Sequence, residues 1–209
     1  MIDIAVKLLI AYVIGSVMGS QVAGWFKGVD IRTAGSGNAG ATNALRTQGK
    51  WFALLVIVID LGKGALAAGW VPYLELGATA TVPEWLPYAC GALCVLGHVF
   101  PVLYGFRGGK GAATLVGTVL VFAPVLVLPL LAVFILTIAL TGFVGLATIV
   151  TTEFAAVLIV LVYGIERLPL LVYAVAMGFV IVVTHRENIR RMVDGTESRN
   201  TKLMLLKRP

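Results

Sequence analysis

Long hydrophobic runs separated by short polar segments make up most of this chain of 209 residues. Runs of this length predict membrane-crossing helices, since about 20 apolar residues span the hydrocarbon core of a bilayer. Glycine, proline and charged residues mark the ends of the runs. The pattern predicts an all-α polytopic integral membrane protein with about seven spans, at residues 4–26, 51–72, 86–105, 112–128, 129–147, 152–165 and 168–184.

The stretch from residue 112 to residue 184 fits either two or four spans. Four spans need about 17 residues each, which is the lower end of the usual range. Some of these helices are therefore expected to be short or broken. Pro124, Pro129 and Gly142 are the candidate breaks, because proline and glycine interrupt helices.

Composition excludes a soluble domain. Apolar residues make up 59% of the chain and charged residues 12%, and the mean hydropathy is +0.98. The first run is longer than a signal-peptide core and lacks a small-residue cleavage site, so it is interpreted as a retained span. We expect residues 1–209 to form a single transmembrane domain.

The net charge of +6 is concentrated at one side of the predicted topology. All lysines and arginines except Lys7, Lys63 and Arg167 lie in the loop of residues 27–50, in the loop of residues 107–110 or in the tail. The segment of residues 73–87 contains two glutamates and no basic residue. By the positive-inside rule, the basic loops and the tail face the cytoplasm.

Three polar segments carry most of the chemistry: residues 35–46 (GSGNAGATNALR), 107–111 (RGGKG) and 185–191 (HRENIRR). Glycine-rich turns, helix N-termini and basic side chains bind phosphate, because backbone N–H groups and cations converge on the anion. Any one segment alone is equally well explained as a loop that turns and fixes topology. Three such segments on one side favour a shared phosphate site.

Two nucleotide motifs are excluded. Residues 35–40 satisfy the dinucleotide pattern GxGxxG, but that pattern requires a strand and a helix of a soluble βαβ unit. The pair Gly109-Lys110 lacks the serine or threonine that follows the lysine of a P-loop. No nucleic-acid partner, metal or cofactor is expected.

A few polar residues lie inside predicted spans. Asp60 and Lys63 are three residues apart, so we expect them to face inward and pair. His98 is interpreted as a hydrogen-bonded structural histidine. Cys90 and Cys94 share a helical face without further ligands nearby, which favours small apolar packing residues over a zinc site.

The polar segments resemble the motifs of the bacterial membrane acyl-phosphate:glycerol-3-phosphate acyltransferase family. The similarity covers GSGNAGATN from Gly35 with a following arginine, GHVFPVLYGFRGGKGAAT from Gly97, and HRENIRRMVDGTE from His185. Ala39, Arg107 and Met192 replace commoner isoleucine, lysine and leucine. These departures remove no group that the chemistry needs.

The resemblance implies transfer of a fatty acyl group from acyl phosphate to the 1-hydroxyl of glycerol 3-phosphate, which gives lysophosphatidic acid and phosphate. We expect the enzyme to be a monomer in the bacterial cell (inner) membrane. The expected catalytic residues are Ser36, Arg46, Lys110, His185 and Asn188. The expected substrate-binding residues are Gly37, Asn38, Gly40, Thr42, Asn43, Gly108, Gly109 and Gly111.

Physical roles follow for the main groups. Arg46 and Lys110 neutralise phosphates, Arg46 in a bidentate manner. The glycines let backbone N–H groups approach phosphoryl or developing oxyanion oxygens. Ser36, Asn38, His185 and Asn188 orient glycerol 3-phosphate. His185 is either a general base or only a hydrogen-bonding group, with a substrate phosphate oxygen taking the hydroxyl proton; the second version is favoured.

Two rival functions remain at this point. A small organophosphate transporter or a lipid flippase also combines spans, basic residues and broken helices. Few charges inside the spans and the lack of an evident repeat weigh against a transport path. The other rival is a different acyl or phosphoryl transferase that uses the same phosphate-binding groups.

Overall fold

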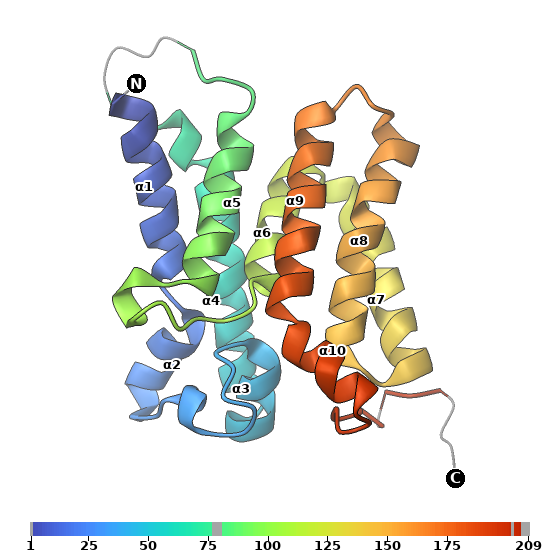
Figure 1. Ribbon diagram of the computed structural model, residues 1–209. Helices are drawn as coiled ribbons and strands as arrows, with labels where there is room; N and C mark the ends of the chain where they lie inside the picture. Colours follow the sequence, from blue (N-terminus) through green and yellow to red (C-terminus); the bar gives the residue numbers. More distant parts are fainter. Residues whose placement is uncertain (1, 77–80, 202, 206–209) are drawn as a thin grey trace. The chain divides into compact units, whose positions relative to one another are not determined.

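The computed structural model describes residues 2–76, 81–201 and 203–205, and within them the regular elements are all helical (Figure 1). This confirms the all-α membrane fold expected from the sequence. The α-helices are α1 (Ile2–Ser16), α2 (Gly19–Lys27), α3 (Ala41–Gln48), α4 (Lys50–Gly69), α5 (Leu86–Val99), α6 (Ala112–Phe122), α7 (Val127–Thr141), α8 (Val144–Tyr163), α9 (Leu168–Thr184) and α10 (Arg186–Val193). The 3₁₀ turns are η1 (Ile31–Thr33), η2 (Val71–Tyr73), η3 (Val102–Tyr104) and η4 (Pro124–Leu126). The chain divides into two compact units, Met1–Phe122 and Ala123–Pro209.

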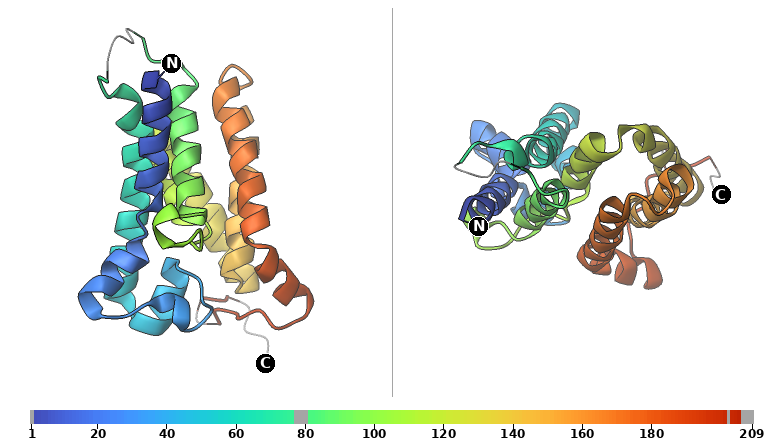
Figure 2. Two further views of the ribbon diagram at one scale, coloured as in Figure 1. Left: turned by 60° about the vertical axis from the view of Figure 1, so that its left-hand side comes forward. Right: turned by 90° about the horizontal axis from the view of Figure 1, so that it is seen from above.

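The first unit is built around α4, which contacts α1, α2, α3, α5 and α6. The most extensive helix pairs of this unit are α4 with α6 and α1 with α5. Figure 2 shows α1 beside α5. Glycines lie where these helices touch: a side chain at Gly15 would overlap the backbone of Cys94, and one at Gly64 would overlap the backbone of Thr114. Small residues let membrane helices approach closely, which is how they gain packing contacts without a hydrophobic driving force.

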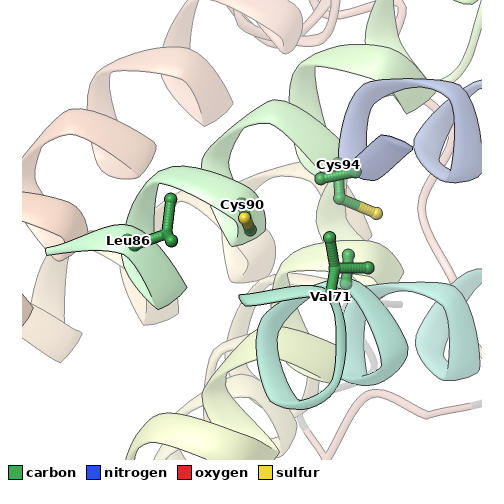
Figure 3. Close-up of a cluster of buried hydrophobic side chains, with 6 residues drawn as sticks. Val71, Leu86, Cys90 and Cys94 are labelled. Atoms are coloured by element: carbon green, nitrogen blue, oxygen red, sulfur yellow. The ribbon is translucent and has the colours of Figure 1, made fainter. Parts of the chain in front are cut away.

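A cluster of buried residues between α1, α4 and α5 forms one core of this unit (Figure 3). Cys90 and Cys94 of α5 lie in it with Leu86, while Val71 enters from the turn after α4. Both thiols are fully buried. Their interpretation as small packing residues is therefore confirmed.

The second unit is an antiparallel helical arrangement in which α8 contacts both α7 and α9, and the short α10 contacts α8 and α9. Helix α8 begins at Val144, whereas the sequence pattern placed the start of this span at residue 152. The hydroxyls of Thr148 and Thr152 donate to the carbonyls of Val144 and Thr148, four residues earlier. Because the helix itself satisfies these hydroxyls, the polar residues do not interrupt it.

The other span boundaries also needed correction. Helix α6 ends at Phe122 instead of residue 128, because η4 begins at Pro124. Helix α7 ends at Thr141, where Gly142 adopts a left-handed conformation with φ of 75°. Pro129 does not break α7, since it lies in the first turn, where its missing N–H group costs no helical hydrogen bond.

The first run and the run at residues 86–105 are interrupted as well. Helices α1 and α2 are bent by 44° at the break after Ser16, and α5 ends at Val99, ahead of η3. Four helical stretches of the described residues are long and apolar enough to cross a membrane, or six if each bent pair counts as one. Helix α6 is apolar but shorter, so the count of seven spans stays a prediction, and residues 77–80 of the loop expected outside lie beyond the described part.

Candidate active site

The first polar segment is held in shape by the buried side chain of Asn43 on α3. Its Nδ2 donates to the carbonyls of Ile31 (2.9 Å) and Ala34 (3.0 Å). Its Oδ1 accepts the backbone N–H of Ser36 at 2.9 Å. Gly35 has φ of 61° and leaves no room for a side chain beside this amide. Asn43 therefore holds the loop in its conformation through these hydrogen bonds. Its role as a substrate contact stays a prediction.

Helix α3 presents two of the predicted site residues together. Thr42 and Arg46 are four residues apart on this helix and are both exposed, so they lie on one face. Gly40 precedes the helix and its carbonyl accepts the N–H groups of Asn43 and Ala44. The exposed Ser36 lies in the loop that leads into the helix. The segment thus offers a hydroxyl, a guanidinium and a helix N-terminus over a short length of chain.

Ahead of this loop, Asp30 and Arg32 form an ion pair, with 2.7 Å between Arg32 Nη2 and Asp30 Oδ2. The hydrogen bonds from the Arg32 side chain hold the pKa of the Asp30 carboxyl well below its ordinary value, with further help from the Arg32 backbone N–H and the Gln21 amide. Arg32 Nη1 also reaches the carbonyl of Arg107 at 3.5 Å. This contact joins the turn just ahead of the first polar segment to the second segment.

The second polar segment folds back onto the end of α5. Gly108 N donates to the carbonyl of Val99 at 3.2 Å, and Gly109 N donates to the carbonyl of His98 at 3.1 Å. A side chain at Gly108 would overlap those carbonyls, and one at Gly109 would overlap the His98 ring. Glycine is therefore needed here for close packing. The expectation that these two N–H groups face a phosphate is corrected, because α5 already accepts them.

The end of the second segment leads directly into α6. Gly111 has φ of 86°, in the left-handed region that favours glycine, and its carbonyl accepts the N–H of Leu115 at 2.8 Å. The first-turn N–H groups of α6 are those that a helix leaves without an internal partner. Lys110 is half-buried directly before this helix start. Anion binding by Lys110 and the α6 N-terminus stays a prediction, and both lie where the second segment meets α6.

Asp60 and Lys63 are buried and paired, as expected, with 3.0 Å between Lys63 Nζ and Asp60 Oδ1. His98 is also buried, and its Nδ1 lies 2.7 Å from Lys63 Nζ. The interpretation of His98 as a hydrogen-bonded structural histidine is confirmed. Its ring lies directly beneath Gly109.

The third polar segment lies at the junction of α9 and α10, where the two helices are bent by 54°. His185 and Asn188 are buried, whereas Arg186 and Glu187 between them are exposed. His185 Nδ1 lies 2.8 Å from the carbonyl of Ile181. A carbonyl only accepts, so Nδ1 carries the proton and Nε2 has the lone pair.

Glu197 is a functional candidate that the sequence interpretation missed. Its Oε1 accepts from Asn188 Nδ2 at 2.7 Å, and its Oε2 accepts from Arg191 Nε at 2.6 Å. Within the described ranges the ion pairs of α10 run to Asp194 and Glu197, whereas Glu187 is exposed. The sequence did contain a signal for this contact, because Gly195 indicates a turn shortly before Glu197. In the structure Gly195 has φ of 72°, in the left-handed region that favours glycine.

The structure brings the first and second segments together in the first unit, and it places His185, Asn188 and Glu197 together in the second. The first unit offers cations beside membrane helices, and the second offers a histidine held by the Ile181 carbonyl and an amide held by Glu197. These features define a class of integral membrane proteins that act on phosphorylated substrates at the membrane surface.

Comparison with known proteins narrows the class. The glycerol-3-phosphate acyltransferase family model matches residues 5–195, and the chain belongs to this family. A glycerol-3-phosphate acyltransferase of Geobacter sulfurreducens is 38% identical over 200 residues, covering 95% of this chain and 98% of that protein. One of Bacillus subtilis is 37% identical over 195 residues, covering 93% and 96%.

The solved structures that resemble this chain include PlsY (YgiH), described as an integral membrane glycerol 3-phosphate acyltransferase. Its glycerol 3-phosphate form has 34% sequence identity and a TM-score of 0.84, with 96% of both chains covered. Its lysophosphatidic acid form has the same identity and a TM-score of 0.82, with 94% of both chains covered.

Proposed function

We propose that this protein transfers a fatty acyl group from acyl phosphate to the 1-hydroxyl of glycerol 3-phosphate and releases lysophosphatidic acid and phosphate. The observation that carries the proposal is the family match over residues 5–195, within which all three polar segments lie. The relatives named above are glycerol-3-phosphate acyltransferases. The PlsY forms with glycerol 3-phosphate and lysophosphatidic acid support this acceptor and this product.

The reaction forms one ester bond and breaks one mixed-anhydride bond. The 1-hydroxyl oxygen attacks the carbonyl carbon of acyl phosphate, and the bond from that carbon to the bridging phosphate oxygen breaks. Phosphate is a good leaving group, so no acid catalyst is required for its departure. The hydroxyl proton passes to a phosphate oxygen of the substrates in the version that we favour, with His185 as a hydrogen-bonding group.

The roles of the site residues follow from their chemistry. Arg46 and Lys110 bind and neutralise the two phosphates. The α6 N-terminus and the turn at Gly111 present N–H groups to acyl phosphate. Ser36, Asn38, His185 and Asn188 orient glycerol 3-phosphate, with Gly37, Gly40 and Thr42 shaping its loop. All three segments are expected to face the cytoplasmic side of the bacterial inner membrane.

The lipid bilayer is part of the proposed site. A fatty acyl tail needs an apolar groove, while glycerol 3-phosphate is a small polar metabolite of the cytoplasm. A site at the cytoplasmic face receives both substrates and leaves the product in the membrane. We expect a single copy of the chain to be sufficient for this reaction.

The decisive experiment is a donor assay with purified protein in detergent. Acyl phosphate, acyl-CoA and acyl-carrier protein of one chain length are each supplied with labelled glycerol 3-phosphate, and labelled lysophosphatidic acid is measured. We expect product from acyl phosphate alone, with one phosphate released per product. Lys110→Ala is the matched control and should be nearly inactive.

Product from acyl-CoA at a comparable rate would assign the protein to another type of acyltransferase. Uptake of labelled glycerol 3-phosphate into sealed vesicles that contain the protein, without acylation, would favour a transporter instead.

A further inference from the structure

The buried pair on α4 holds together a broken helix. Lys63 Nζ donates to the carbonyls of Gly15 (2.9 Å) and Val17 (2.7 Å), at the end of α1. Asp60 Oδ1 accepts the N–H of Gly19, at the start of α2, at 3.0 Å. Helix ends leave backbone groups without partners, and a bilayer supplies no water to satisfy them. The pair therefore caps both sides of the break between α1 and α2.

His98 extends this cluster to the end of α5. Its Nδ1 lies 2.7 Å from Lys63 Nζ and 3.4 Å from Asp60 Oδ1. The Lys63 ammonium group can only donate hydrogen bonds, so His98 Nδ1 accepts one from it and the ring proton lies on Nε2. The Nε2 edge faces Gly109, because a Cβ there would overlap this atom first.

The cluster is too costly to be explained by packing alone. Asp60 is 1% exposed, Lys63 6% and His98 3%. Ionisable side chains within membrane helices are expensive, and apolar residues of similar size would fill the same space more cheaply. What apolar residues could not supply is the set of contacts to the α1–α2 break and to the loop of residues 107–111.

We propose that Asp60, Lys63 and His98 are positioning residues that set the conformation of the glycine loop, residues 107–111, with the His98 ring occupying the side-chain space of Gly109. Lys63 and Asp60 fix the tautomer and orientation of His98, and His98 supports the loop from which Lys110 and α6 follow. The kinetic consequence rests on the proposed function, in which this loop binds acyl phosphate.

The first test is a double-mutant cycle between positions 98 and 109. Asparagine at position 98 keeps an oxygen near Nδ1 for Lys63 but removes the ring edge beneath Gly109. Gly109→Ala should raise the KM for acyl phosphate about tenfold or more in the wild-type background and about threefold or less in His98→Asn, because the added methyl group then has room. The KM for glycerol 3-phosphate should change less in every variant.

Gly108→Ala is the matched control. Its Cβ would overlap the backbone carbonyls of His98 and Val99, which the His98→Asn change leaves in place. Its effect on KM should therefore be the same in both backgrounds. An equal cost of Gly109→Ala with and without the ring, or equal relief of both glycine variants, would overturn the proposal.

A second measurement does not depend on the acyl donor. The chain has two histidines, so ¹⁵N-histidine NMR of the folded protein resolves His98 from His185 once His98→Asn or His185→Gln removes one signal. We expect His98 in the wild type to carry its proton on Nε2, and Lys63→Met to abolish this preference. A protonated Nδ1 in the wild type would overturn the network even if the donor assay succeeds. The expected tautomer together with failure of the donor assay would overturn only the proposed function.

Discussion

At the scale of single residues, the amide of Asn43 and the N–H groups of Gly108 and Gly109 show where sequence reasoning stops. Their chemical types predict a phosphate site as a class. The direction of each group depends on segments distant in sequence: Asn43 bonds to the carbonyl of Ile31, and Gly109 N bonds to that of His98. A motif shows which groups are present, and the fold decides which of them face a ligand.

His185 is the residue at which two versions of the mechanism separate. Its Nδ1 lies 2.8 Å from the Ile181 carbonyl, so the proposed contact with the acceptor would use Nε2. A glutamine amide reaches the Nε2 position and keeps a hydrogen-bonding group there, whereas asparagine restores only the Nδ1 contact. We expect His185→Gln to retain at least about tenfold more activity than His185→Ala, and His185→Asn to resemble alanine.

The pH profile of the same variants supplies the check. Loss of a general base costs about 10²–10⁴ in rate and removes an ionisation near the ordinary histidine pKa of about 6.5. If the histidine only orients the acceptor, the acidic limb of the pH–activity profile survives in His185→Gln, because phosphate monoesters have an ionisation of their own at about 6. A glutamine variant as inactive as alanine, with the limb lost, would establish His185 as the base.

At the scale of elements, hydrophobic periodicity predicted where helices exist better than where they end. Gly142 and Pro124 mark true helix boundaries. The left-handed conformation of a glycine and the missing N–H group of a proline both act locally on the backbone. The break after Ser16 lies between Gly15 and Gly19, but no proline or charge lies at residues 15–18, and both glycines also serve close helix packing. It is stabilised by Lys63 and Asp60, on a helix that follows much later in the chain. No local pattern encodes a partner of that kind.

The junction of α9 and α10 depends on Glu197, which holds Asn188 and Arg191 through its two carboxylate oxygens. Glu197→Ala would leave a buried amide without its acceptor, which typically costs about 1–3 kcal/mol. We expect a lower thermal unfolding midpoint and a raised KM for glycerol 3-phosphate, because Asn188 loses its orientation. Glu187→Ala is the matched control on the exposed side of α10 and should behave like the wild type. Equal effects of the two variants would contradict the assigned role of Glu197.

At the scale of the whole molecule, the short helix α6 decides the topology. Helix α4 has 20 residues, which is about the thickness of a bilayer core at 1.5 Å per residue. The contacts of Gly64 with Thr114, and of Gly69 with Val121, place α6 alongside the second half of α4. Helix α6 therefore begins beside the middle of α4. Its 11 residues are enough to reach the other side.

This packing also explains why composition predicted the membrane fold but not the form of the site. Positive residues indicated which loops share a side, because that rule depends on charge alone. The loop of residues 107–111 lies against the end of α5 because Gly108 and Gly109 bond to the carbonyls there. Irregular backbone beside membrane helices is tolerated when the protein satisfies it. That satisfaction comes from tertiary contacts, which a hydropathy pattern does not contain.

Single cysteines labelled with a membrane-impermeant maleimide test the resulting topology. Cysteines at Lys50, Arg107 and Ser198 should react only from the cytoplasm, whereas those at Glu84, Val125 and Glu166 should react only from outside. All six positions are exposed, and the native Cys90 and Cys94 are buried, so the unmodified protein serves as the unlabelled control. Val125 is the critical position because it follows α6 directly. If Val125 reacts from the cytoplasm, α6 does not cross. The three remaining helices α7, α8 and α9 would then put Ser198 on the side opposite Lys50, which would contradict the expected cytoplasmic position of both residues.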